Sequence, residues 1–197
     1  MIDHKILIVS SAAARTAIRT IARKVYFLSP SVAFSDNYDL QLALYDEICE
    51  FLKLPISAIR LVGSAHTGFS LVRGTPFDPE KSDLDIAIVD AGMYLQLFEE
   101  AFEQTRGWED TSKFAGNFDA LGRKNQFLRY LRKGVIRPDL MPSSPLKAEW
   151  TNFFGKLGDK YATFCRGITA GVYARESFMA AQQESAIKMF LENEVSR

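Results

Sequence analysis

The sequence is poor in the residues that build disulfide frameworks and metal clusters. Its 197 residues include two cysteines, Cys49 and Cys165, and two histidines, His4 and His66. This is too few soft ligands for a structural zinc site, and two cysteines so far apart in the chain indicate reduced thiols. A hydrophobic content of 47% is enough to bury a real core. We therefore expect a fold that is stabilised by core packing.

The sequence also lacks an excess of charge of either sign. Lys and Arg together number 24, as do Asp and Glu, so the formal net charge is zero. Without an overall basic field, any contact with nucleic acid or phosphate must be local.

Long apolar runs are missing as well. The stretch Ile6-Leu7-Ile8-Val9 is too short to span a membrane, and neither a basic lead-in nor a clear cleavage site accompanies it. We expect no membrane insertion and a cytoplasmic location.

The apolar periodicity predicts alternating helices and strands. Helices are expected at 11–27, 39–52, 93–104 and 123–132, strands at 58–62, 83–89 and 135–141, and helical structure throughout from residue 146, with a last helix at about 176–193. This order predicts an α/β (α+β) fold with a small mixed sheet flanked by helices. Residues 1–145 would form the core with its N-terminal helices, and residues 146–197 a C-terminal helical segment packed on it.

Asp83 and Asp85 lie two residues apart on the clearest predicted strand. Alternation places both carboxylates on one face, about 7 Å apart at the backbone. Two carboxylates this close repel each other, and a divalent cation relieves the repulsion while both stay ionised. Mg²⁺ suits such oxygen ligands. Ordinary surface acids on a solvent-facing strand are the alternative.

Gly63 and Ser64 follow the predicted strand at 58–62. A helix that starts here would present free backbone N–H groups and a hydroxyl to a phosphate, and glycine lets the backbone approach closely. A simple turn with an N-terminal cap is the alternative.

The order of these features resembles the signature of the DNA polymerase β nucleotidyltransferase superfamily. The resemblance covers 58–141 and is carried by Gly63-Ser64 and by Ser82-Asp83-Leu84-Asp85 on an alternating strand. It implies that Gly63 and Ser64 bind a nucleotide's phosphates and that the two aspartates hold catalytic metals, two Mg²⁺ or Mn²⁺ ions. The 18 residues from 65 to 82 make a longer gap than minimal members have, which leaves the subfamily open.

The resemblance also implies a third carboxylate on a neighbouring strand, which binds metal and takes the proton of the attacking hydroxyl. We predict Asp139 for this role, because it lies on the expected strand at 135–141, whereas Asp119 lies in a polar segment flanked by glycine. A capping or surface role is the alternative for Asp139. We also assign Ser82 and Arg137 to nucleotide binding.

The function implied is transfer of NMP or dNMP from a nucleoside triphosphate such as ATP to a hydroxyl, with release of pyrophosphate. The product would be a short single-stranded oligonucleotide or a nucleotide signal in prokaryotic antiviral defence. One alternative is AMPylation of a partner toxin by an antitoxin. Another is a nucleotide-binding partner module without catalysis.

Two weaker signals remain open. The basic stretch at 123–133, with Phe127 and Tyr130 interleaved, fits either a grip on a triphosphate or short strand, or a solvated helix face with two aromatic residues in the core. His66 follows the Gly-Ser pair closely enough to touch a substrate, with a place on the helix surface as the alternative.

Overall fold

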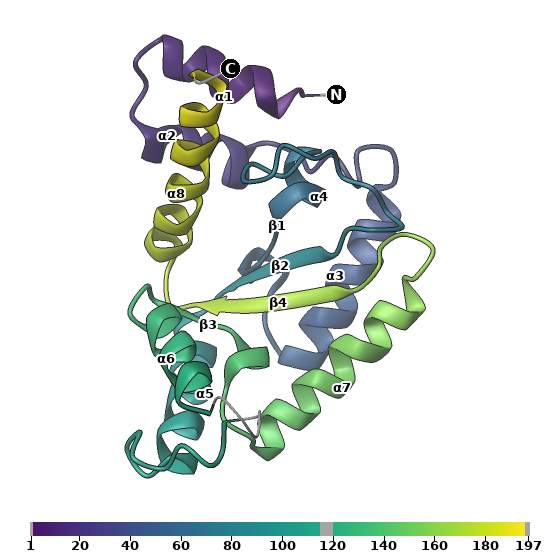
Figure 1. The fold of residues 1–197 in the computed structure, drawn as a ribbon. Coiled ribbons are helices and arrows are strands. Elements are labelled where there is room, and N and C mark those ends of the chain that lie inside the picture. The colour runs from purple at the N-terminus through teal and green to yellow at the C-terminus, as the bar shows by residue number, and fades with distance from the viewer. Residues whose placement is uncertain (1, 115–119, 196–197) are drawn as a thin grey trace.

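The computed structural model of the protein describes residues 2–114 and 120–195. Its centre is a four-stranded mixed sheet in the order β1-β2-β4-β3 (Figure 1). The strands are β1 (Ile59–Val62), β2 (Leu84–Val89), β3 (Val135–Ile136) and β4 (Ile168–Tyr173). β2 pairs antiparallel with β1 and parallel with β4, and β3 pairs antiparallel with β4. The predicted α/β fold, a small mixed sheet flanked by helices and followed by a C-terminal helix, is confirmed.

Alternation along β2 divides the core into two clusters. Leu84, Ile86 and Ile88 face a large cluster that includes side chains of four helices: α3 (Tyr38–Leu52), α5 (Ala91–Gln104), α6 (Ala120–Leu131) and α7 (Pro145–Lys160). Ala87 faces the other cluster, which α1 (His4–Ala13), α2 (Ile18–Arg23), η1 (Lys24–Leu28) and α8 (Glu176–Val195) help to form. Figure 1 shows α1 and α2 at one end of the molecule and α5 and α6 at the other, with α8 running from the first end toward the sheet. By its place in the alternation, Asp85 shares the face of Ala87.

The predicted N-terminal helix at 11–27 is wrong in its extent. The chain forms α1 earlier, leaves the helix at Arg15 with a left-handed φ of 58°, and resumes as α2 and η1. The arginines of α2 face carboxylates of α8: Arg19 pairs with Glu184 at 2.7 Å, and Arg23 with Glu176 at 3.3 Å. These ion pairs join two helices that are far apart in the sequence.

The prediction that the chain is helical throughout from residue 146 is wrong. Between α7 and α8 the chain forms β4, which lies inside the sheet between β2 and β3. Ala170 and Gly171 weaken the strand signal of this sequence, and its stability comes from pairing on both sides. The division of the chain at residue 145 stays a prediction, but the part after it supplies a strand of the central sheet.

The predicted strand at 135–141 ends after two residues. Pro138 cannot donate a ladder hydrogen bond and its φ is fixed, so the chain turns into the 3₁₀ helix η3 (Pro138–Leu140). Two further short helices, η2 (Ile56–Ala58) and α4 (Gly63–Thr67), flank β1. Within the described ranges, no helix combines the length and the apolar character needed to cross a lipid bilayer.

Candidate functional site

Gly63 begins α4 directly after β1 and lies against the carboxylate of Asp85. Its φ is +67°, a conformation that L side chains rarely adopt. A Cβ atom on this residue would stand 2.6 Å from Oδ2 of Asp85, closer than real contacts allow. Glycine is therefore favoured at position 63 for two separate reasons, its backbone conformation and the close approach of the Asp85 carboxylate.

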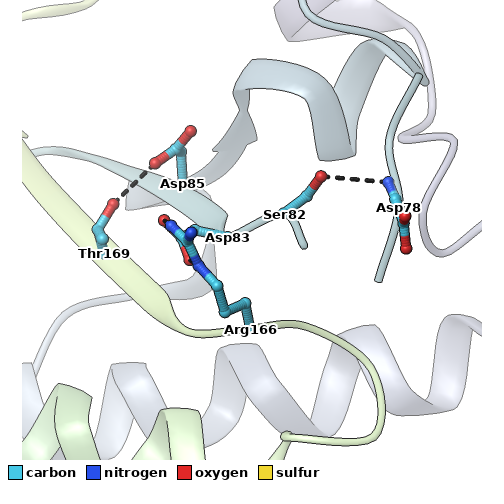
Figure 2. Close-up of polar contacts among 6 residues, drawn as sticks. All are labelled: Asp78, Ser82, Asp83, Asp85, Arg166 and Thr169. Carbon is cyan, nitrogen blue, oxygen red and sulfur yellow. Dashed lines mark hydrogen bonds and ion pairs between the residues drawn. The ribbon is translucent and has the colours of Figure 1, made fainter. Parts of the chain in front are cut away.

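Asp85 is half-buried on β2, with Val62 of β1 and Thr169 of β4 as its register partners. The Thr169 hydroxyl donates a hydrogen bond of 2.8 Å to Oδ1 of Asp85 (Figure 2). Burial raises the pKa of Asp85, and the charge of Asp83 raises it further, while the hydrogen bond from Thr169 lowers it. The two carboxylates thus repel each other, as their spacing in the sequence predicted.

Asp83 lies one residue before β2 and is held by Arg166. The guanidinium makes two parallel bonds, Nε to Oδ1 at 3.0 Å and Nη2 to Oδ2 at 2.7 Å (Figure 2). Arg166 belongs to the turn between α7 and β4, and its backbone N–H donates to the carbonyl of Ser82 at 3.0 Å. Both oxygens of Asp83 therefore face a cation that comes from 83 residues further along the chain.

These residues line a cleft of about 230 Å³. Five residues that the sequence predicted for the site lie in it: Gly63, Ser64, Ser82, Asp83 and Asp85. Three cationic side chains line the same cleft: Arg73, Lys81 and Arg166. The carboxylates thus lie beside the glycine turn, in a cavity that also holds hydroxyls and positive charge.

The insertion at 65–82 is folded and forms one wall of this cleft. Its backbone closes on itself through hydrogen bonds from Ser70 N–H to Thr75 O and from Gly74 N–H to Ser70 O, both 2.7 Å long. Leu71 anchors it in the core. The insertion supplies Arg73 and Lys81, and Lys81 pairs with Asp78 at 2.8 Å.

A second cavity of about 270 Å³ adjoins the first at Gly63 and Asp85. Arg137, Tyr130 and Thr169 line it. The guanidinium carbon of Arg137 lies 5.4 Å from the centroid of the Tyr130 ring, a cation–π contact. The structure thus places Arg137, which the sequence assigned to nucleotide binding, beside Asp85 but not in the cleft with Asp83.

Asp139 does not join the two other aspartates. It lies on η3 and makes a bidentate ion pair with Arg137 at 3.0 and 2.7 Å. Across the described parts of the chain, no three His, Cys, Asp or Glu side chains are grouped so that they could hold a metal ion. The strands beside β2 are β1 and β4, neither of which carries Asp139, and the β4 residue next to Asp85 is Thr169. The prediction for Asp139 assumed a strand that Pro138 ends.

The residues present fit one divalent cation that Asp83 and Asp85 share. Their carboxylates line the same cleft and repel each other. The Arg166 guanidinium already binds the Asp83 carboxylate, which shows that this carboxylate accepts a positively charged partner. Asp oxygen atoms are ligands that Mg²⁺ and Mn²⁺ accept. The described residues do not provide the three-carboxylate set of a two-ion site.

The alternative for His66, a place on the helix surface, is wrong, and His66 does not line the cleft either. The basic stretch largely follows its own alternative, a solvated helix face. His66 is buried, and its Nε2 donates to the carbonyl of Val25 at 2.7 Å, so it tethers α4 to η1. Arg123 and Arg129 on α6 and Arg132 and Lys133 in the turn after it are exposed, and Phe127 is in the core. Tyr130 is the member of this stretch that lines the second cavity.

Comparison of the chain with protein-family models, with curated proteins and with solved structures finds no match.

Proposed function

We propose that the cleft binds the divalent-metal complex of a nucleoside triphosphate and transfers its nucleotidyl group to a hydroxyl. The observation that carries the proposal is the contact between Asp85 and Gly63 in a cleft that Asp83 and three cationic side chains also line. A glycine turn beside two carboxylates and excess positive charge suits a metal-bound polyphosphate.

Each residue has a distinct task in this proposal. Asp83 and Asp85 hold the cation, which when bound neutralises charge on the phosphates and on the departing pyrophosphate. Gly63 lets phosphate oxygens approach the backbone, and the Ser64 hydroxyl donates to them. Arg73, from the insertion, offsets further negative charge. The acceptor oxygen bonds to the α-phosphorus as the bond from that phosphorus to the bridging oxygen breaks, pyrophosphate leaves, and the proton of the acceptor hydroxyl passes to solvent water.

A second function, nucleotide binding without transfer, is favoured by one specific observation. Thr169 stands beside Asp85 on the neighbouring strand, where a carboxylate that takes the proton of the acceptor would be expected. A threonine hydroxyl is not basic at neutral pH, so it orients Asp85 but cannot replace that carboxylate. In this alternative, the metal–nucleotide complex would order the cleft for a partner.

The test is incubation of the purified chain with each α-labelled nucleoside or deoxynucleoside triphosphate, with Mg²⁺ or Mn²⁺. A ladder of products would support oligonucleotide synthesis, and label on a co-purified protein would support AMPylation of a partner such as a toxin. Metal-dependent nucleotide binding without any labelled product would support the binding module.

Two test variants and one control each replace a carboxylate by a neutral amide. Asp83→Asn and Asp85→Asn should each abolish product and metal-dependent nucleotide binding. Asp46→Asn, an exposed carboxylate on α3, should leave both unchanged. If all three variants behave as the wild type does, the metal site is not at this pair of aspartates.

A further inference from the structure

The ion pair between Arg166 and Asp83 occupies the side chain that the proposed function needs for metal binding. Both Asp83 oxygens accept bonds from the guanidinium, at 3.0 and 2.7 Å. A divalent cation could not use these oxygens without displacing Arg166 from at least one of them. The cleft therefore carries its own counter-ion for Asp83.

The Arg166 side chain is exposed to solvent, whereas its backbone is held by hydrogen bonds. The side chain is 64% exposed and that of Asp83 is 28% exposed, so solvent screens the pair and its net strength is small. The backbone N–H of Arg166 donates to Ser82 O at 3.0 Å, and the carbonyl of Gly167 accepts from Leu84 N–H at 2.9 Å. A guanidinium on this fixed anchor can turn within the cleft that it already lines.

We propose that Arg166 is an exchangeable counter-ion, which holds Asp83 in the metal-free cleft and turns to the polyphosphate when a divalent cation takes Asp83. The inference rests on the proposed function and adds a coupling between its two ligands. The guanidinium fork that fits a carboxylate bidentately fits phosphate oxygens equally well. Arg73 lines the same cleft and would receive phosphate oxygens together with it.

The exchange makes metal and polyphosphate binding cooperative. A cation that binds alone displaces Arg166 from Asp83 and gives the guanidinium no new anionic partner. A cation that arrives with a polyphosphate provides that partner. Each ligand therefore raises the affinity of the other, by an equal factor in both directions.

The experiment compares two titrations by isothermal calorimetry, Mn²⁺ alone and the preformed complex of Mn²⁺ with inorganic tripolyphosphate. Arg166→Ala should bind Mn²⁺ alone about 3-fold more tightly than the wild type, because the competing cation is gone. It should bind the complex about 10-fold more weakly, because a charged partner of the phosphates is gone. Arg166→Gln, which keeps the length of the side chain without its charge, should shift both affinities in the same two directions.

The matched control is Arg19→Ala. Arg19 makes an ion pair of the same 2.7 Å with Glu184 at similar exposure, 62%, but it lies on α2 outside the cleft. This variant should leave both affinities unchanged, and its denaturant midpoint measures what loss of such a pair does to the fold.

Opposite shifts for the two ligands support an exchangeable counter-ion. A purely structural Arg166 would weaken both affinities or neither, and either result overturns the inference. If the wild type binds Mn²⁺ and Asp83→Asn does not, while Arg166→Ala matches the wild type, the inference fails and the metal site stands. If Mn²⁺ binds neither the wild type nor Arg166→Ala, the inference and the proposed function both fail.

Discussion

Replacing Gly63 by alanine tests the contact on which the candidate site depends. Two separate effects follow from the structure. Alanine at a φ of +67° is strained by about 1 kcal/mol relative to glycine. In addition, its Cβ would stand 2.6 Å from Oδ2 of Asp85, so the carboxylate must turn away.

The second effect has its own magnitude. A carboxylate that turns away from Gly63 gives up the 2.8 Å hydrogen bond from Thr169, and a hydrogen bond to a charged group contributes about 1.5 kcal/mol or more. The expected total loss for Gly63→Ala is therefore about 2.5 kcal/mol of unfolding free energy. Displacement of Asp85 should also remove the affinity for Mn²⁺.

Gly107→Ala separates the two effects. Gly107 has a φ of +73°, but a Cβ there would meet nothing closer than Cζ of Phe102 at 3.5 Å, an ordinary contact. This variant should lose only the strain, about 1 kcal/mol, and keep its Mn²⁺ affinity. Urea unfolding followed by circular dichroism measures both losses. Equal losses for the two variants, with Mn²⁺ still bound by Gly63→Ala, would refute the placement of Asp85 against the turn.

Three further predictions concern His66, Thr169 and Asp139. Burial lowers the pKa of His66 from 6.5 to about 4, so His66 takes up a proton in the unfolded chain at a higher pH than in the folded one. The free energy of unfolding should therefore fall by about 3 kcal/mol as the pH drops from 6.5 to 4. Urea unfolding should depend less on pH in His66→Gln than in the wild type, and an equal dependence in both would contradict this. Thr169→Val removes a hydrogen bond to ionised Asp85, so the pKa of Asp85 should rise further. A ¹³C titration of the Asp85 carboxyl measures this, and a fall in its pKa would show that the hydrogen bond does not stabilise the ionised carboxylate. Asp139→Asn should leave Mn²⁺ affinity unchanged, and a large loss would place Asp139 among the ligands.

The elements that the sequence predicted well are those whose signal is local. β2 alternates between apolar and other residues along its whole length, and α3 has regular apolar spacing ended by Pro55 beyond it. β4 has no such signal, because Ala170 and Gly171 interrupt it and its two neighbours in the sheet come from distant parts of the chain. A strand of this kind is stabilised by pairing partners that a single sequence does not reveal.

The same distinction applies to the candidate site. Gly63, Ser64, Asp83 and Asp85 could be predicted together because their spacing encodes a turn and one face of a strand. The partners of the two aspartates lie more than 80 residues further along the chain: Arg166 binds Asp83, and Thr169 binds Asp85. Neither an arginine nor a threonine by itself indicates that it binds a site carboxylate. Asp139 was predicted from its order along the chain, and Pro138 removes it from the strand on which that prediction depended.

The insertion explains how a chain of zero net charge could bind a polyanion. Asp83 and Asp85 together balance the charge of one divalent ion, so in the metal-bound cleft the positive charges of Arg73 and Arg166 would face the phosphates without a carboxylate competing for them. Arg73 comes from the loop that lengthens the motif, and Arg166 from the turn before β4, so two segments outside the motif supply the attraction. The local positive charge that the overall composition does not provide thus lies at one cleft, and the segment between Ser64 and Asp83 contributes two of its three cationic side chains, Arg73 and Lys81.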